Sequence, residues 1–385
     1  MASSSLATVR CVAPTQVRSR LSTQNARQTK YALTRSQKRS SNRRQKSSFR
    51  NHASADDSSS ESSNDLTTGL AHDEYLRSVA ATPPPAELGA LIAVLQAQGA
   101  TPVLPSEREG LHPLCIPLAR NSDESVTCLK LNVEDTAIEV VNAVDGVHLS
   151  LLSKNCKEYV VKAMVVEEAE ANENGDDKSD AIIATAAGAI GASLYEPGAF
   201  TTLGKDIPTY LTLRVGKFPE QMEQLTQKHL SKSPSDEMSA FVTCDLYKST
   251  FGFWGRPHWY LSNIYERLDR KEESRDCARF ALTDCEWSTL GSVEDLNECL
   301  ERSGWSGKTV DEVKEIIDTR RGPNRDAFDG PKTDAQVAEE LALTLLDKVA
   351  FGELSTKEVI QRLAECYSTA EKPGLAKLVM SAYSL

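Results

Sequence analysis

The sequence predicts an α+β fold: a small antiparallel sheet with helices in the N-terminal half, followed by a C-terminal half of α-helical hairpins. Two observations predict it. Four short runs rich in Val, Ile and Leu lie between residues 112 and 153, and polar or Gly-containing breaks separate them, as in antiparallel strands. From about residue 205 onward, the dominant pattern becomes a repetition of helix start signals.

The first 55 residues predict a chloroplast transit peptide. They contain twelve Lys or Arg residues, many hydroxyl residues and no Asp or Glu, which is the composition of a segment that stays unfolded and cationic during import. The Met-Ala start with Ser after it favours the chloroplast over the mitochondrion. A basic tail that binds nucleic acid is the alternative, and such a tail would persist in the mature protein. Residues 56–82, which begin with an acidic, Ser-rich stretch, are expected to be a disordered linker.

The predicted small α/β domain covers residues 83–200. It begins with an amphipathic helix, because Pro residues stand at the first turn, apolar residues follow at helical spacing, and Gly99 stands at the stop. After the strands, Asn155 is the expected N-cap of another helix, with Glu158 three residues later. The four strand runs are residues 112–118, 125–132, 137–141 and 147–153.

The predicted helical-hairpin domain covers residues 201–385. Its helix start signals are Pro219, Ser235, Pro257, Ser292, Thr309, Thr333 and Ser355. The last three of these have Glu or Gln at the third following position, the sequence pattern of a capping box. Helices that follow one another through short loops mostly pack as hairpins.

Residues 259–282 predict one such hairpin. Ser274 follows Tyr265 by nine residues, and Ala278 and Ala281 take the next inward positions, where small side chains let two helices approach closely. This spacing resembles a tetratricopeptide repeat, although that pattern has a bulky residue where Ala278 stands. A second unit, with Tyr367 before Ala376, lies 102 residues further on. The sequence therefore favours tetratricopeptide-like hairpins over a regular solenoid.

The net charge narrows the class of partner. The chain has 44 basic and 55 acidic residues, and removing the twelve cations of the first 55 residues leaves 32 basic against 55 acidic, a net charge of −23. Such a surface repels nucleic-acid phosphates and anionic lipid. No apolar stretch reaches the roughly 18 residues that cross a bilayer. We expect a soluble stromal protein with a protein partner, no nucleic-acid partner and no integral membrane segment.

Catalytic and metal-binding motifs are not recognisable in the sequence. Residues 303–310, SGWSGKTV, contain Gly-Lys-Thr but lack the first Gly of a phosphate-binding loop. The nine Cys residues form no Cys-x-x-Cys pair. His112 and His148 fall on predicted strands, where a hydrogen-bonded His is more usual than a metal ligand. We therefore expect no catalytic residues, no cofactor, no metal and no enzymatic activity.

Residues 251–260, FGFWGRPHWY, form the candidate partner-binding site. Aromatic side chains stand beside an Arg and a His, which is the composition of a binding hot spot. The structural interpretation is a helix entry whose aromatic side chains are buried between the two halves of the protein. The candidate contacts are Trp254, Arg256, His258 and Trp259.

Spaced blocks over residues 110–385 resemble the Protein in Chloroplast ATPase Biogenesis family of plastids. The blocks are GLHPLCIPLAR, VHLSLLSKNCKEYV, TYLTLRVGKFPEQMEQLTQKHL, RDCARFAL and RLAECYSTAEKPGLAKLV. The chain departs from the family pattern at residues 181–195 and around Cys285, where the family is expected to have an aromatic-rich turn.

The resemblance implies a non-enzymatic stromal assembly factor. Such a factor would bind a subunit of the chloroplast ATP synthase, the γ subunit, and promote its incorporation into the catalytic core. Two alternatives stay open at this point: an assembly factor for another thylakoid complex, a photosystem or a cytochrome complex, and a stromal enzyme without a recognisable motif.

Overall fold

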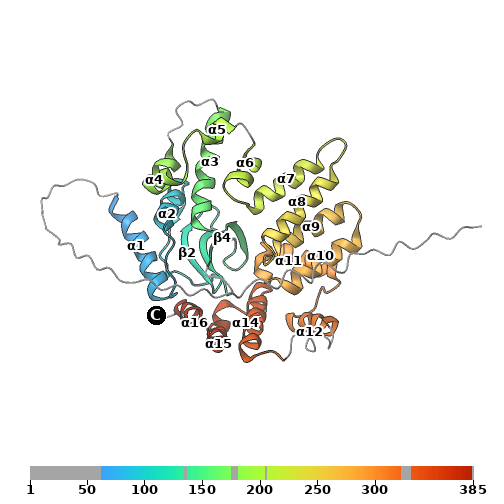
Figure 1. Ribbon diagram of the computed structural model, residues 1–385. Coiled ribbons are helices and arrows are strands. Elements are labelled where there is room, and N and C mark those ends of the chain that lie inside the picture. The colour runs from blue at the N-terminus through green and yellow to red at the C-terminus, as the bar shows by residue number, and fades with distance from the viewer. Residues whose placement is uncertain (1–61, 134–136, 175–180, 204–205, 322–330, 384–385) are drawn as a thin grey trace, which may run out of the picture. The chain divides into compact units, whose positions relative to one another are not determined.

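The four predicted strand runs form a five-stranded antiparallel sheet together with a short edge strand, which confirms the α+β prediction. In the computed structural model, the described residues are 62–133, 137–174, 181–203, 206–321 and 331–383, and the expected transit peptide lies outside them. Neighbours in sequence are neighbours in the sheet, in the order β1-β2-β3-β4-β5. Figure 1 shows the sheet, with β2 and β4 labelled. The strands are β1 (Thr101–Pro102), β2 (Cys115–Arg120), β3 (Val126–Leu131), β4 (Ile138–Ala143) and β5 (Leu149–Ser153).

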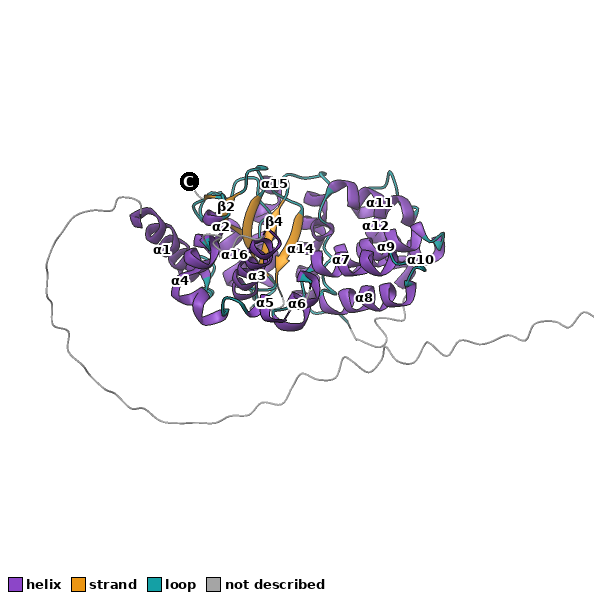
Figure 2. Cartoon of the chain, turned by 90° about the horizontal axis from the view of Figure 1, so that it is seen from above, coloured by secondary structure: helices purple, strands orange, loops and turns teal. Residues whose placement is uncertain are grey.

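Successive strand residues alternate between two hydrophobic cores, as the two-residue period of a strand requires. Ile116, Leu129 and Val140 belong to one core, whereas Cys128 and Val141 belong to the other. Every residue of β3 is buried. Antiparallel sheets commonly leave one face to water, but here helices cover both faces, and Figure 2 shows the strands enclosed by helices.

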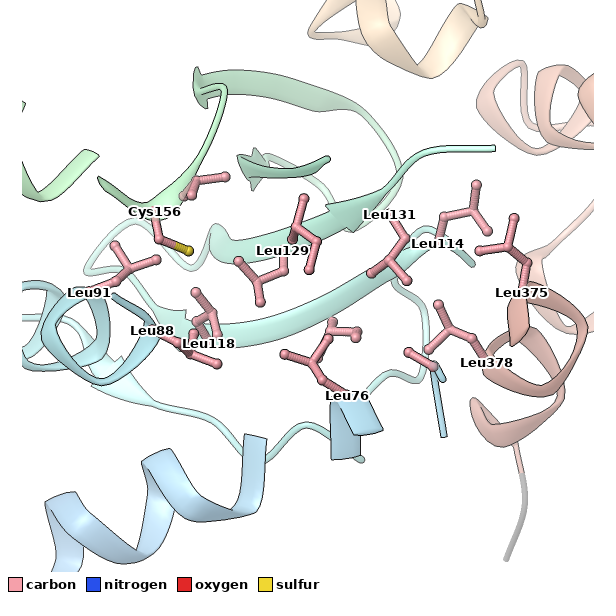
Figure 3. Close-up of a cluster of buried hydrophobic side chains, with 14 of the residues drawn as sticks. Leu76, Leu88, Leu91, Leu114, Leu118, Leu129, Leu131, Cys156, Leu375 and Leu378 are labelled. Carbon is pink, nitrogen blue, oxygen red and sulfur yellow. The ribbon is translucent and has the colours of Figure 1, made fainter. Parts of the chain in front are cut away.

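Helices from both ends of the described chain build the first core. Leu76 of α1 (Ser62–Ser78), Leu91 of α2 (Leu88–Ala97) and Leu378 of α16 (Pro373–Ser381) pack in one cluster with strand residues. Figure 3 shows side chains of these segments converging on those of the sheet. The guanidinium of Arg108 ties this arrangement together by donating hydrogen bonds to the carbonyl oxygens of Cys115 and Leu378. Residues from both predicted domains therefore share a core, and the predicted division at residue 200 stays a prediction.

Helix α1 differs from the expected linker. It lies within residues 56–82, and its last turns bury His72 and Leu76 completely. The Nε2 atom of His72 lies 2.8 Å from the carbonyl oxygen of Pro117 in β2. The segment is mostly polar, so its few apolar residues gave no sequence signal for burial. They are buried because the folded sheet and α16 provide the surface on which they pack.

The predicted helix starts lie close to the observed ones in both halves of the chain. Asn155 caps α3 through a bond of 2.8 Å from the Glu158 amide, and full capping boxes form at Thr333 and Ser355. The remaining helices are α3 (Cys156–Asn174), α4 (Ile182–Leu194), α5 (Ala199–Leu203), α6 (Ile207–Arg214), α7 (Pro219–Leu230), α8 (Glu237–Thr250), α9 (Arg256–Arg267), α10 (Lys271–Asp284), the 3-10 helix η1 (Trp287–Leu290), α11 (Val293–Ser303), α12 (Val310–Arg321), α14 (Asp334–Ala350) and α15 (Thr356–Thr369).

Helices α9 and α10 form the predicted hairpin. Ser274, Ala278 and Ala281 are fully buried, so the small residues do lie inward. Tyr265 is partly buried and stacks on Phe241 of α8 with a centroid distance of 5.2 Å. The tetratricopeptide-like character of this hairpin stays a prediction.

The small-residue segment 181–195 forms α4, which packs on α2 and α3. Gly188 interrupts the helix with a φ of 58° and a ψ of −146°, a backbone conformation that L side chains rarely adopt. At Gly191 an added Cβ would lie 3.2 Å from the sulfur of Met164 in α3. Small residues are therefore required for this close approach.

Candidate partner-binding site

The candidate segment 251–260 joins α8 to the first turn of α9 and lies against the sheet. Trp254 is buried, and its indole Nε1 donates to Glu139 Oε1 of β4 over 3.3 Å. The ammonium of Lys130 lies 5.7 Å from the centroid of the same ring. Trp254 thereby anchors the segment to the sheet.

Arg256 links three helices. Its guanidinium forms a two-pronged pair with Glu223 of α7, at 2.9 and 3.1 Å, and a further bond of 2.9 Å with Asp295 of α11. The same group lies 4.1 Å from the ring centroid of Trp259. Burial would lower the pKa of Arg256, but the two carboxylates outweigh it and raise that pKa, so the bridge stays charged.

His258 and Trp259 are also engaged by neighbouring helices. The imidazole of His258 is buried and stacks on Phe280 of α10 at a centroid distance of 4.3 Å. Burial, with the nearby charge of Lys248, lowers the pKa of His258 to about 4, so this ring is neutral at pH 7. The indole Nε1 of Trp259 donates to Glu298 Oε2 of α11 over 3.1 Å.

A row of polar contacts joins α7, α9 and α11 around these residues. Tyr260 donates to the carbonyl oxygen of Glu223 over 3.0 Å and receives a bond of 2.8 Å from Gln227. Arg302 of α11 donates to Ser262 over 3.2 Å and to Glu298 over 2.8 Å. Charge-assisted bonds of this kind are stronger than neutral ones, so the polar row fixes the three helices relative to one another.

The structure thus brings the four predicted residues together, and each has contacts within the protein. Phe253 is 78% exposed, the Arg256 side chain is 33% exposed, and Trp259 is partly exposed. Partner contact by Trp254, Arg256, His258 and Trp259 stays a prediction. Phe253 belongs to the same aromatic run, between Gly252 and Trp254. The sequence alone could not show that its side chain is exposed.

The structure contains a polar cluster, largely buried, whose members the sequence did not indicate as partners. His112 Nε2 lies 2.6 Å from Glu286 Oε1, and Lys130 pairs with the other carboxylate oxygen at 3.5 Å. Burial would lower the pKa of His112, but the charge of Glu286 and hydrogen bonds to Glu286 and Cys115 raise it to about 9. The ring is therefore hydrogen-bonded, as expected, although both His112 and His148 lie just before strands. Glu286 lies 174 residues from His112, so no local signal could have paired them.

Cys115 completes this cluster. Burial would raise the pKa of its thiol, but hydrogen bonds with Cys128 and His112, and the charges of His112 and Lys130, lower it to about 5. His112 and Lys130 thus lie beside the Glu286 carboxylate and the Cys115 sulfur, between β2, β3 and the residue before η1. His112, Lys130 and Cys115 are buried, and the Glu286 side chain is 12% exposed. The cluster therefore joins β2 and β3 to the start of η1 through charged groups largely shielded from water.

Two further observations concern the described parts of the chain alone. Within them, the His, Cys, Asp and Glu side chains include no group of three or more that could hold a metal ion. Across the same ranges, no helix combines the length and the apolar character that a bilayer span requires.

Comparison with known proteins places these features in a family. The family models described as PAB N-terminal, PAB middle domain and PAB C-terminal domain match residues 70–214, 219–306 and 311–382 in order. The chain is 32% identical over 318 residues to Protein IN CHLOROPLAST ATPASE BIOGENESIS, chloroplastic, of Arabidopsis thaliana, and the match covers 80% of this chain and 90% of that protein. No solved structure matches the chain. The resemblance inferred from spaced sequence blocks is thereby confirmed: the chain belongs to the Protein IN CHLOROPLAST ATPASE BIOGENESIS family.

Proposed function

We propose that this protein is a chloroplast assembly factor for the ATP synthase, which binds the γ subunit and promotes its incorporation into the catalytic core. The observation that carries the proposal is the match over 90% of a relative whose name states chloroplast ATPase biogenesis. A match of that extent covers all three family domains and not one shared module.

The charge of the chain supports a protein partner of opposite charge. Beyond residue 55, 32 basic residues stand against 55 acidic ones. Complementary charge speeds association and suppresses wrong partners. An acidic factor of this kind holds a basic, unassembled subunit in a salt-dependent complex until the next subunit replaces it.

The proposal includes location and mode of action. The cationic, acid-free first 55 residues act as the transit peptide, and the mature protein works in the stroma without a cofactor and without bond-making chemistry. The candidate segment contributes to binding through the exposed ring of Phe253 and the exposed edge of Arg256, with Trp254, His258 and Trp259 setting their positions.

Binding of purified components tests this function. The full chain is mixed with isolated γ subunit, and separately with isolated α and β subunits, at low and at high salt. We expect a complex with γ at low salt that weakens at high salt, because exposed charges are screened over about 8–10 Å at physiological ionic strength. Absence of a γ complex at both salt concentrations would contradict the proposal.

A further inference from the structure

A groove of about 660 Å³ lies between α3, α6 and α7, and Leu152 of β5 also contributes to its lining. Its apolar lining comes from Tyr159 and Val166 of α3, Phe200 of α5, and Ile207 and Pro208 of α6. This volume falls within the range of natural binding pockets.

Hydrogen bonds and an ion pair hold the walls of the groove in place. The carboxylate of Glu168 on α3 accepts bonds of 2.8 Å from the Gly198 amide and 2.9 Å from the Thr201 amide, which fixes α5 against α3. Lys162 of α3 pairs with Glu220 of α7 at 3.0 Å. The groove is therefore a built feature of the fold and not a loose gap between helices.

One buried polar atom at the groove has no hydrogen-bond partner in the described chain. Gln221 of α7 lines the groove and is only 2% exposed. Its amide nitrogen donates to Glu220 Oε2 over 3.3 Å, whereas its carbonyl oxygen Oε1, which can only accept, has no hydrogen-bond partner. A buried acceptor without a donor is unfavourable, so the groove favours an occupant that donates a hydrogen bond here.

The charges around the groove favour a cation. Three carboxylates line it, those of Glu173, Asp206 and Glu220, against the single ammonium of Lys162. Asp206 pairs with Lys228 at 3.2 Å and accepts a bond from Thr209. Glu220 pairs with Lys162 at 3.0 Å and accepts bonds from the side-chain amides of Gln221 and Gln224, so both carboxylates keep only part of their acceptor capacity. Among the titratable lining groups, hydrogen-bond acceptors therefore outnumber donors. The apolar lining residues form the adjacent wall of the groove.

An arginine side chain satisfies both features. Its guanidinium offers five donors in a plane and no acceptor, and its methylene stem packs on apolar and aromatic surface. We propose that this groove binds an arginine, together with the apolar residues next to it, from a basic amphipathic segment of the partner subunit. The inference rests on the proposed function and adds a second surface for the same partner, separate from the candidate segment 251–260.

Two variants and a matched control test the groove. Glu220→Gln removes a carboxylate, and Gln221→Leu removes the unpartnered acceptor while keeping the volume similar. Glu365→Gln is the control, because Glu365 is an exposed Glu of α15 away from the groove lining. We expect the Kd of the full chain for isolated γ subunit to rise by about tenfold or more in each groove variant and to stay unchanged in the control. Thermal unfolding of all three variants at or above the wild-type midpoint shows that folding is intact.

The outcomes separate this inference from the proposed function. If the wild-type chain binds γ and both groove variants bind it as tightly as the control, the groove inference is overturned and the function stands. If the wild-type chain itself does not bind γ, the proposed function fails. A photo-reactive group at the exposed rim residue Gln224 adds a direct readout. Crosslinking to a γ peptide that contains Arg beside apolar residues supports the groove, and crosslinking to an acidic peptide overturns it.

Discussion

The hydroxyl group of Ser262 on α9 lies 2.8 Å from the carbonyl oxygen of Ser274 on α10, to which it donates a hydrogen bond. Both serines are fully buried, and their hydroxyl oxygens lie 3.1 Å apart. This contact exists because neither residue has a side chain large enough to separate the helices. The polar residues of segment 259–282 thus include groups that hold a hairpin together.

Replacing Ser274 with Leu should destabilise the protein. The added atoms have no space between α9 and α10, and the substitution also removes the hydroxyl that faces Ser262. We expect the free energy of unfolding to fall by about 2–3 kcal/mol, as for overpacked cores. Urea unfolding measures this change. Ser249→Leu, at an exposed position of α8, is the control and should change stability by less than about 0.5 kcal/mol. Equal effects of the two substitutions would contradict close packing at Ser274.

Arg256→Lys should weaken the polar row although it keeps the charge. An ammonium cannot form the two-pronged pair with Glu223 and reach Asp295 at the same time. We expect a loss of about 1–2 kcal/mol in the free energy of unfolding, because bonds to charged groups are lost from a partly buried site. Arg120→Lys, whose side chain is 48% exposed and pairs with Glu124 at 3.7 Å, should have little effect. A fully stable Arg256→Lys variant would show that the bridge contributes nothing.

Two glycine substitutions should have opposite effects. A Cβ at Gly255 would lie 2.9 Å from Leu290 Cγ, in a place where the Gly255 amide already donates to Thr289 over 2.8 Å. Gly255→Ala should therefore lower the free energy of unfolding by about 1–3 kcal/mol.

Gly89 lies on an exposed face of α2 with open space around it, so Gly89→Ala should raise the free energy of unfolding by about 0.5–1 kcal/mol. Thermal and urea unfolding of both variants check these signs, and a stabilising Gly255→Ala would refute the packing of η1 against α9.

The buried cluster around His112 predicts a pH dependence. The pKa of His112 rises from 6.5 to about 9 on folding. Protonated His112 therefore stabilises the folded protein fully below pH 6.5, and this part of the free energy of unfolding is lost as the pH rises toward 9. The pKa of Cys115 falls from 9.0 to about 5 on folding. Ionisation of this thiol therefore stabilises the folded protein increasingly over the same pH range and offsets the loss from His112. The measurement therefore belongs in a Cys115→Ala background.

In that background the contacts with Cys115 that help to raise the pKa of His112 are lost. The free energy of unfolding should therefore fall by less than about 3 kcal/mol between pH 6.5 and 9, at about 1.4 kcal/mol per pKa unit. Adding His112→Gln should remove most of this slope. Glu286, whose pKa is lowered, and Lys130, whose pKa is raised, titrate outside the window. An unchanged slope in the double variant would contradict a protonated His112 in the folded protein.

Features encoded by neighbouring residues were predictable from the sequence. The capping boxes at Thr333 and Ser355 depend on residues three positions apart, and the strand runs depend on alternation and breaks within about ten residues. The inward positions of Ser274 and Ala278 follow from helical spacing in one hairpin. Each of these signals is local, so it survives without knowledge of the tertiary structure.

Features that depend on distant pairing were not predictable. Helix α1 has a polar composition, and the burial of Leu76 depends on α16, about 300 residues later in the chain. The bond between His112 and Glu286 joins two parts of the chain whose local sequences do not indicate a partner. In the candidate site, the sequence named the aromatic and basic residues, but the bridge from Arg256 to Glu223 and Asp295 requires three helices to be in place. The groove has the same origin, since its lining comes from separate helices.

The most direct measurement of the proposed function is the content of thylakoid complexes after disruption of the gene. ATP synthase, the photosystems and the cytochrome complex are quantified in the same membranes, with the wild-type gene and the Glu365→Gln gene as restoring controls. We expect a selective loss of assembled ATP synthase, with free γ subunit excluded from the catalytic core and the other complexes at normal levels. Normal ATP synthase levels, or an equal loss of a photosystem or cytochrome complex, would contradict it.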